Sequence, residues 1–172
     1  MSFSSPHQMR RSDRQMAPEK ALEVLDSALF AVLAVIDTTA ETFAIPYSIP
    51  LSFAFDRKNM ALYFHKARGA GRLLHCMAAS QTPLPAHCSI VTDVHTLPQK
   101  FSTEYASAMI EGELDLLDTD AEKLEALLML TAKYSPGFEK EALAYATKSV
   151  GKVDIVRLRI SRLTGKSRPV RQ

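Results

Sequence analysis

Two long stretches in the second half of the chain alternate apolar and charged side chains, and they constrain the fold more than any other feature. The first covers residues 105–117 and sets an apolar face against an acidic one: Ile110, Gly112, Leu114 and Leu116 against Glu111, Glu113 and Asp115. The second covers residues 152–161 and sets an apolar face against a basic one: Val156, Leu158 and Ile160 against Arg157 and Arg159. Because successive side chains of a strand point to opposite faces, both stretches predict strands with one face in a core and the other in water.

Four further strands and four helices are predicted from the apolar pattern and the turn residues. The strands are expected at residues 29–36, 42–55, 60–65 and 86–94. The helices are expected at residues 18–27, 68–80, 119–134 and 138–147. Thr119 and Glu122 have the spacing of a capping box at the start of the third helix. We expect this helix to pack over the sheet rather than to offer a face to a partner.

The order of these elements predicts the fold class. No β-α-β-α rhythm runs through the chain, which argues against a doubly wound sheet. We therefore expect a mainly β protein with added α (α+β), built as a six-stranded antiparallel barrel, closed or split, because closure removes exposed strand edges. Residues 17–166 are predicted to form a single domain, preceded by an N-terminal arm of residues 1–16 and followed by a basic C-terminal tail of residues 167–172.

Composition and charge argue against several classes of protein. The longest apolar run among the 172 residues, Ala28–Ile36, has nine residues, whereas a membrane-spanning helix needs roughly 20. The N-terminus lacks the apolar segment of a secretory signal, and two cysteines make no disulfide framework, so we expect a cytoplasmic protein. The net charge is +2, although residues 148–172 carry eight Lys/Arg and one Asp. A net charge this small does not indicate a membrane surface, and the basic end has no aromatic residue to stack on bases, so we expect no membrane partner and no nucleic-acid partner.

Residues 62–74, L-Y-F-H-K-A-R-G-A-G-R-L-L, contain the clearest candidate for a ligand site. A predicted strand ends at His65, and a loop with two glycines leads into a predicted helix. Lys66, Arg68 and Arg72 place positive charge at this junction, where free backbone N–H groups of a helix N-terminus can also bind a phosphate. The alternative is a basic turn on the surface.

A second candidate is the predicted strand that contains Pro46 and Pro50. Each proline lacks the N–H that a strand donates to its neighbour. Either a flat aromatic ligand lies across this strand, or the strand is a sheet edge that proline protects against aggregation.

The repeated pairs His75-Cys76 and His87-Cys88 have the residue types of a zinc site. Adjacent residues of a helix or strand point in different directions, so each pair would splay rather than chelate. We expect no metal, and we expect Cys76 and Cys88 to be core thiols.

Short motifs between residues 9 and 166 match, in order and spacing, those of a known family. They are M-R-R-S-D-R at 9–14, I-P-Y-S-I-P-L-S-F at 45–53, L-Y-F-H-K-A at 62–67, L-P-Q-K-F-S-T-E-Y-A-S-A at 97–108, Gly112, K-Y-S-P at 133–136 and T-G-K at 164–166. With these motifs the chain resembles the FMN-binding split-barrel flavoproteins, the pyridoxamine 5'-phosphate oxidase-like group. Within that group it is most similar to the nitroimidazole-resistance (Nim-type) proteins.

The resemblance implies a Greek-key split barrel of six strands and a homodimer with FMN at the subunit interface. It implies roles for nine residues: Tyr47, Ser48 and Ile49 along the isoalloxazine ring, His65, Lys66 and Ala67 beside the ring and ribityl chain, Arg72 at the phosphate, and Tyr105 and Ser107 from the partner subunit. Two positions depart from the family pattern. Lys66 stands where a small serine or glycine is usual, and Ala70 stands where a glycine is usual.

The resemblance further implies an FMN-dependent oxidoreductase that reduces a small organic molecule, for which nitroaromatics are one candidate class. FMN is expected rather than FAD. No G-x-G-x-x-G fingerprint for a nicotinamide cofactor is present, so NAD(P)H, as a candidate electron donor, would bind only transiently over the ring; the alternative is that another protein delivers the electrons. The alternative is a flavin-binding, sensing or interaction protein without turnover. His65 is the candidate catalytic residue, as a proton donor to the substrate; the alternative is a histidine that ends a strand without chemistry.

Overall fold

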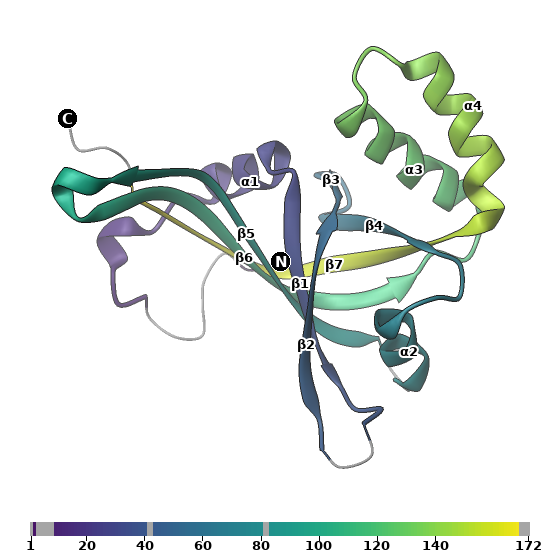
Figure 1. The fold of residues 1–172 in the computed structure, drawn as a ribbon, viewed down its shortest axis with the longest axis horizontal. Helices are drawn as coiled ribbons and strands as arrows, with labels where there is room; N and C mark the ends of the chain where they lie inside the picture. Colours follow the sequence, from purple (N-terminus) through teal and green to yellow (C-terminus); the bar gives the residue numbers. More distant parts are fainter. Residues whose placement is uncertain (1, 3–8, 41–42, 81–82, 169–172) are drawn as a thin grey trace.

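The computed structural model describes residues 2, 9–40, 43–80 and 83–168 (Figure 1). These residues form seven strands: β1 (Phe30–Asp37), β2 (Ile45–Ser52), β3 (Ala54–Asp56), β4 (Ala61–Ala67), β5 (Leu84–Leu97), β6 (Ser102–Leu116) and β7 (Val153–Arg168). They also form four α-helices: α1 (Pro18–Ser27), α2 (Arg72–Ala79), α3 (Asp120–Tyr134) and α4 (Glu139–Ser149). Three short 3-10 helices complete the described elements: η1 (Ser12–Arg14), η2 (Pro98–Lys100) and η3 (Val150–Lys152).

The strands make one antiparallel sheet in the order β2-β1-β5-β6-β7-β4-β3. Neighbours such as β1 and β5, or β7 and β4, are distant in sequence, as the predicted Greek-key connections require. In Figure 1 the outer parts of β5 and β6 extend to the left as an arm, with the end of β7 beside β6, while α3 and α4 stand above β4 and α2 lies below it. The predicted class, mainly β with added α in a split-barrel arrangement, is confirmed.

The predicted number of six strands is wrong, because the single run expected over residues 42–55 is divided at Phe53. Before this residue β2 pairs with β1, and after it β3 pairs with β4, so the chain crosses from one edge of the sheet to the other. The Phe53 side chain is fully buried and packs at a tilted angle on the Phe64 ring, with 6.4 Å between ring centres. Sequence alternation alone does not reveal this change of partner.

Opposite charges on β6 and β7 face each other on the outer surface of the sheet. Asp115 accepts hydrogen bonds from Arg157 at 2.7 and 2.9 Å and forms an ion pair with Arg159 at 2.8 Å. Glu111 pairs with Arg162. Three arginines of the basic C-terminal segment are therefore paired with acids of the neighbouring strand, which fits a solvated sheet face.

The alternation predicted for residues 105–117 is correct up to Leu114 and wrong at Leu116. Ile110, Gly112 and Leu114 are buried, but Leu116 is 39% exposed and Leu117 is buried instead. The strand ends at Leu116, and the Leu117 N–H donates to the Ile155 carbonyl beyond the ladder, so the strict alternation no longer applies.

Gly112 lies where the pairing of β6 with β7 shifts register by one residue. A Cβ atom on Gly112 would be 2.0 Å from the Arg159 carbonyl oxygen, far inside van der Waals contact. Only glycine fits this close approach of two backbones.

The helices largely follow the sequence. Helix α1 has the predicted bounds, and Thr119 and Glu122 make the predicted capping box at the start of α3. Helix α2 begins at Arg72 and not at residue 68, because Gly69 and Gly71 have φ values of +63° and +99°, which a helix cannot contain.

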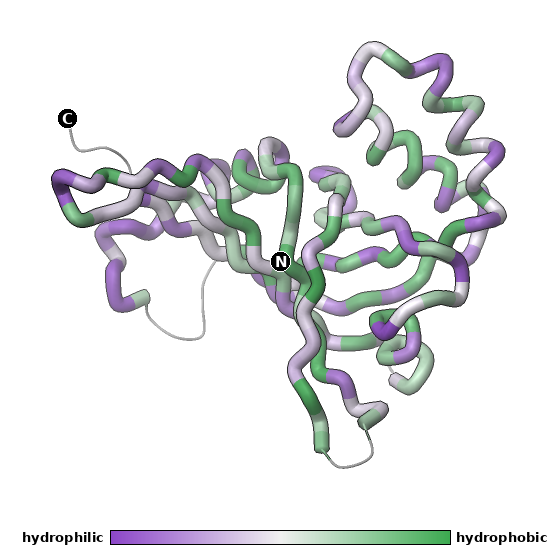
Figure 2. Tube along the Cα trace, viewed as in Figure 1, coloured by the Kyte–Doolittle hydropathy of each residue, from purple (hydrophilic) through white to green (hydrophobic). Residues whose placement is uncertain are grey.

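The core lies on both faces of the sheet. One cluster fills the barrel between α1, α2 and the strands, and a smaller one lies between α3, α4 and the outer faces of β3, β4 and β7. Figure 2 shows hydrophobic segments concentrated where α1, β1 and the central strands meet. Alternate residues of β4 serve the two clusters: Leu62 and Phe64 face the barrel, and Ala61 and Tyr63 face α3.

The predicted terminal segments are described only in part. In the N-terminal arm, the Met16 N–H donates to the Gly165 carbonyl at 2.9 Å and Gln15 forms a bridge with Lys166, so this part follows β7. Strand β7 includes residues 167 and 168 of the predicted tail. Residues 1, 3–8 and 169–172 lie outside the described part of the chain, and the predicted domain boundaries stay predictions.

Candidate functional site

The end of β4 divides its side chains between two regions. Residues 61–64 are buried, after which His65 is exposed, Lys66 is half-buried and Ala67 is exposed. By strand alternation Lys66 continues the face that fills the barrel, and His65 and Ala67 continue the face covered by α3. Lys66 therefore reaches the barrel mouth, and His65 reaches the cleft beside the helices.

We use the name β4–α2 corner for five residues at the barrel mouth: Asp37, Tyr47, Lys66, Gly71 and Arg72. The Arg72 guanidinium lies 4.7 Å from the centre of the Tyr47 ring, and its Nε donates to Asp37 Oδ2 at 2.5 Å. A Cβ atom on Gly71 would lie 4.0 Å from Lys66 Nζ, so the lysine extends along the glycine that precedes α2. The fold thus brings together Tyr47, Lys66 and Arg72, three of the predicted cofactor-binding residues, from three separate segments.

Asp37 is the residue of the corner that the sequence analysis missed. Its carboxylate is almost fully buried and accepts bonds from the Thr39 hydroxyl and the Thr39 N–H, the latter at 2.8 Å. These two bonds and the one from Arg72 hold the pKa of Asp37 well below its usual range. Arg72 is thus already paired with a carboxylate. The signal in the sequence was D-T-T at 37–39, since an Asp that bonds the backbone two residues later is typical of a turn.

Strand β2 is an edge strand in which only one side is paired. Pro46 and Pro50 lie opposite Ile36 and Val32 in an uninterrupted register with β1. Neither proline has an N–H for β1, and backbone groups two and four residues apart point to the same side of a strand. The N–H and C=O of Ser48 therefore face the free edge together with the two prolines. This supports the edge-strand interpretation and leaves a backbone donor open to a flat ligand.

The other three predicted residues of β2 and β4 are Ser48, Ile49 and Ala67. Ile49 and Tyr47 are half-buried and pack on the barrel core, whereas Ser48 is exposed on the opposite face. Ala67 is exposed at the last position of β4, opposite Val153 of β7.

Tyr105 and Ser107 lie on the β5–β6 arm and not at the β4–α2 corner (Figure 1). Ser107 is buried, and its Oγ donates to the Lys166 carbonyl at 3.1 Å. Desolvation of the Tyr105 hydroxyl raises its pKa, but hydrogen bonds from Lys166 and Arg14 outweigh this and lower it. A single chain therefore does not bring these two residues to the other seven.

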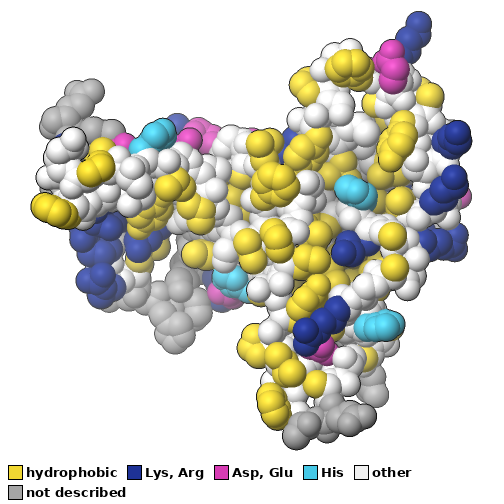
Figure 3. All heavy atoms as spheres, viewed as in Figure 1, with side chains coloured by type: hydrophobic (Ala, Val, Ile, Leu, Met, Phe, Trp, Pro, Cys, Tyr) yellow, Lys and Arg dark blue, Asp and Glu magenta, His cyan; other side chains and the backbone are white. Residues whose placement is uncertain are grey.

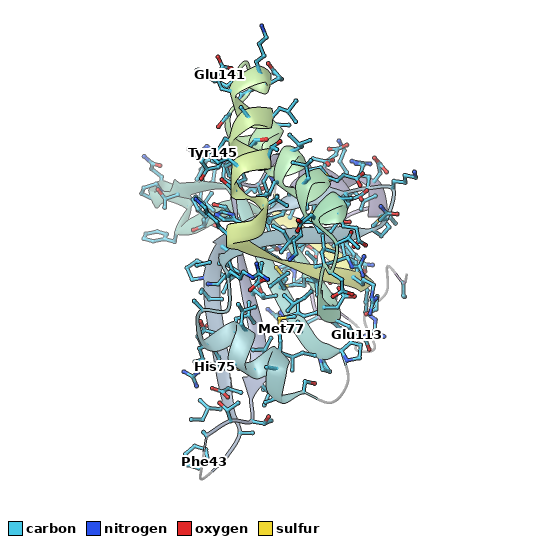
Figure 4. The ribbon with its side chains drawn as sticks, turned by 90° about the vertical axis from the view of Figure 1, so that its right-hand side faces the viewer. Phe43, His75, Met77, Glu113, Glu141 and Tyr145 are labelled. Carbon is cyan, nitrogen blue, oxygen red and sulfur yellow. The ribbon has the colours of Figure 1, made fainter. Side chains whose placement is uncertain are left out.

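A cleft of about 360 Å³ lies on the other side of the end of β4, between the strands and the two C-terminal helices. It is lined by Ser52, His65, Leu127, Leu130, Thr131, Tyr134, Ser135, Tyr145, Ser149 and Val153. His65 thus stands between this cleft and the predicted flavin position. In Figure 4, α4 with Tyr145 stands above the sheet and α2 with His75 lies below it.

Two neighbouring residues of α3, Lys133 and Tyr134, hold this helix against the end of α1 and the break between β2 and β3. The Tyr134 hydroxyl accepts a bond from the Phe53 N–H at 2.9 Å and donates to the Leu29 carbonyl, so it ties α3 to the break between β2 and β3. The Lys133 ammonium lies 3.7 Å from the centre of the Phe53 ring and donates to the Leu25 carbonyl. Burial lowers the pKa of Lys133 to about 8. The K-Y of K-Y-S-P at 133–136 is therefore a structural clamp.

The two cysteines are buried thiols, as predicted. Cys76 and Cys88 are free and buried, and burial raises the pKa of both, that of Cys88 to about 12. His75 and His87 are exposed, so each His-Cys pair points in two directions. Among the described residues no three His, Cys, Asp or Glu side chains are grouped as a metal site requires.

In the described part of the chain, no helix has the length and apolar character needed to cross a bilayer.

Comparison with known families defines the class of protein. Residues 17–167 match the family model described as pyridoxamine 5'-phosphate oxidase. The chain therefore belongs to the pyridoxamine 5'-phosphate oxidase family. The match spans all four α-helices and the sheet as far as residue 167 of β7. A search of the curated proteins gives no match.

Solved structures with the same fold include flavoproteins. A flavocytochrome, Anf3, from Azotobacter vinelandii has a TM-score of 0.75 at 19% identity, over 98% of this chain and 76% of that chain. An FAD and heme binding protein from Mycobacterium smegmatis has a TM-score of 0.71 at 23% identity, over 91% and 74%. A candidate 5-nitroimidazole antibiotic resistance protein from Bacteroides thetaiotaomicron has a TM-score of 0.66 at 16% identity, over 94% and 96%. At these identities the likeness establishes the fold.

Proposed function

We propose that this protein is a flavin-dependent oxidoreductase that binds FMN at the β4–α2 corner and reduces a small organic molecule. The observation that carries the proposal is the meeting of Tyr47, Lys66 and Arg72 at the mouth of the barrel, beside the free edge of β2. Membership of the pyridoxamine 5'-phosphate oxidase family, and the FAD named for two structural neighbours, support a flavin site. The choice of FMN over FAD is part of the proposal.

The donors at the corner fit a flavin mononucleotide. Lys66 and Arg72 supply cationic donors next to the N-terminus of α2, where backbone N–H groups also favour an anion. The Ser48 N–H on the free edge of β2 can bond an oxygen or nitrogen of a flat ring. Asp37 and Tyr47 hold Arg72 in one orientation, so little freedom is lost when the phosphate binds.

The chemistry divides between cofactor and chain. A bound flavin supplies the transfer of electrons or hydride. His65, exposed at the end of β4, donates a proton to the substrate from the side of the cleft. Candidate substrates include nitroaromatics, since one structural neighbour is named for 5-nitroimidazole resistance. NAD(P)H is the candidate reductant of the flavin.

We further propose a homodimer in which the β5–β6 arm of a second copy completes the site with Tyr105 and Ser107. The outer face of the sheet carries apolar side chains that are 42% to 62% exposed: Phe30, Val32, Ile36, Val91 and Met109. Strand register places them on one face, and Figure 3 shows hydrophobic side chains at the surface along the arm and along β1 and β2. Covering this face suits an obligate interface of about 2,000 Å² or more.

Mass spectrometry of the small molecule released on denaturing the purified protein tests the cofactor. FMN supports the proposal, FAD corrects the cofactor, and the absence of any flavin contradicts it. Anaerobic addition of NADPH, followed by re-oxidation with a nitroaromatic, then separates an oxidoreductase from a flavin-binding protein without turnover. Sedimentation that shows a monomer at micromolar concentration would contradict the two-subunit site.

A further inference from the structure

The cleft beside His65 is part of a longer groove. A second cleft of about 420 Å³ adjoins it and is lined by Thr131, Ser135, Phe138, Glu141, Ala142 and Tyr145. Thr131, Ser135 and Tyr145 line both clefts. We call the combined surface the α3–α4 groove; it runs from His65 at the end of β4 to Phe138 at the start of α4.

The inner half of the groove, around His65, carries no acidic residue, no lysine and no arginine. Its apolar walls come from Leu127, Leu130, Val153 and the rings of Tyr134 and Tyr145. A volume of about 360 Å³ lies at the lower end of the range for small-molecule pockets. An uncharged, largely apolar lining favours an uncharged aromatic ligand and offers an anion no counter-charge.

Two polar side chains of the inner half are bonded within the fold. The Thr131 hydroxyl donates to the Leu128 carbonyl, and the Tyr134 hydroxyl is held by Phe53 and Leu29. The His65 imidazole has no hydrogen-bond partner among the described residues, and the same is true of the side chains of Ser52, Ser135, Tyr145 and Ser149. Of these unbonded groups, His65 is the one next to Lys66 of the β4–α2 corner, so a polar substituent at the end nearest the proposed flavin would meet His65.

We propose that the inner half of the α3–α4 groove binds the substrate, and that this substrate is a neutral aromatic molecule whose polar substituent faces His65. Its ring packs between Leu127, Leu130 and the Tyr145 side chain, and any apolar extension follows α4 towards Phe138. This inference rests on the proposed function, because it places the substrate beside the flavin. It excludes a phosphorylated or carboxylated substrate from the groove, in spite of the family to which the chain belongs.

Equilibrium dialysis of the protein as purified against a matched pair of probes tests the proposal. The probes are 4-nitrobenzyl alcohol, which is neutral, and 4-nitrobenzoate, an anion of nearly the same size. We expect the alcohol to bind at least about tenfold more tightly, because the inner groove has no cation to compensate the carboxylate. Equal affinities, or tighter binding of the anion, would overturn the proposal.

Variants on α4 locate the probe. Tyr145→Ala removes a lining side chain that is 66% exposed, so it should not disturb folding, and should weaken binding of the alcohol at least about fivefold. Leu143→Ala is the matched control, because Leu143 is 51% exposed on the same helix and lines neither cleft. Flavin content should be unchanged in both. Equal loss in both variants, or no loss in Tyr145→Ala, would place the probe elsewhere.

A charge introduced into the groove should reverse the preference. Ser149→Arg places a cation at the end of α4 in the inner half and should raise the affinity for 4-nitrobenzoate relative to the alcohol. An unchanged ratio in a folded Ser149→Arg protein would contradict the assignment. If no flavin is released from a protein that passes these tests, the proposed function fails while the groove stands as a site for neutral aromatics. If flavin is present and neither probe binds, the groove assignment alone fails. In that case a change in the sedimentation coefficient of Tyr145→Ala relative to the wild type would indicate that a second copy of the chain covers the groove.

Discussion

Two adjacent residues of β4, His65 and Lys66, lead into regions of opposite character. On the side of Lys66 lies the β4–α2 corner, where Arg72, a buried Asp37 carboxylate and the Tyr47 ring hold one another in contact. On the side of His65 lies the inner half of the α3–α4 groove, with an uncharged and mostly apolar lining. One region is charged and contains an ion pair, and the other has a neutral lining that includes the unbonded His65 imidazole.

The difference follows from the pleat of a single strand. Because side chains alternate across β4, one residue step changes the neighbourhood from the barrel mouth to the surface covered by α3 and α4. A site built on such a strand end can recognise an anionic cofactor on one side and a neutral substrate on the other. The two recognitions can then be altered separately by mutation.

Loss of His65 should have the largest effect on this division. If His65 delivers the proton, His65→Ala should lower turnover by about 10²- to 10⁴-fold while flavin affinity changes little. Steady-state rates with saturating FMN and a nitroaromatic substrate measure it. His75→Ala serves as the control, because His75 is exposed on α2 and lines neither half of the groove. Wild-type rates in His65→Ala would reduce this residue to a wall of the groove.

Arg72→Ala should act on the charged region alone. Loss of a charge-assisted bond to the phosphate should weaken FMN binding by about 10- to 150-fold, with little change for riboflavin, which has no phosphate. Fluorescence titration of the two flavins measures the difference. Equal weakening of both would show that Arg72 supports the fold and not phosphate recognition.

The same substitution leaves the buried Asp37 without its cation, so Arg72→Ala should also lower the urea midpoint. Adding Asp37→Asn should restore part of the stability but none of the FMN affinity. A double variant that recovers both would mean that Arg72 acts on FMN only through folding.

Tyr134→Phe should destabilise the base of the neutral region by about 1–3 kcal/mol. Without the hydroxyl, the Phe53 N–H and the Leu29 carbonyl lose their partner at the break between β2 and β3. Urea unfolding measures the change, and Tyr145→Phe provides the control because that ring is largely exposed. A similar midpoint for Tyr134→Phe and the wild type would show that water replaces the clamp.

The smallest expected effect is a pH dependence due to Lys133. Burial holds its pKa at about 8, whereas an unfolded lysine titrates near 10.4. Between these values the unfolded chain binds more protons, so the free energy of unfolding should rise with pH, by about 1 kcal/mol after allowance for solvent screening. Urea midpoints at pH 8 and pH 10 should show this rise in the wild type and not in Lys133→Met. An equal rise in both would assign it to another group.

The sequence predicted the elements wherever a local signal was sufficient. The bounds of α1, the capping box of α3 and the alternation in β7, and in β6 as far as Leu114, depend on residues close together in the chain, and all are confirmed. The late start of α2 depended on the backbone of Gly69 and Gly71, whose positive φ values the residue types permit but do not require.

What only the tertiary structure decided are the contacts between segments distant in sequence. The break at Phe53 exists because β2 and β3 pair with opposite edges of the sheet, and no neighbouring residue signals this change. The pairing of Arg72 with Asp37 and the opening of His65 onto α3 and α4 bring together residues 35 to 84 positions apart. The residue types that could bind a cofactor could be identified from the sequence, because charge and alternation are local properties. The curvature of the sheet decides which of these residues contact one another and which are already bonded within the fold. That curvature is set by the packing of the core.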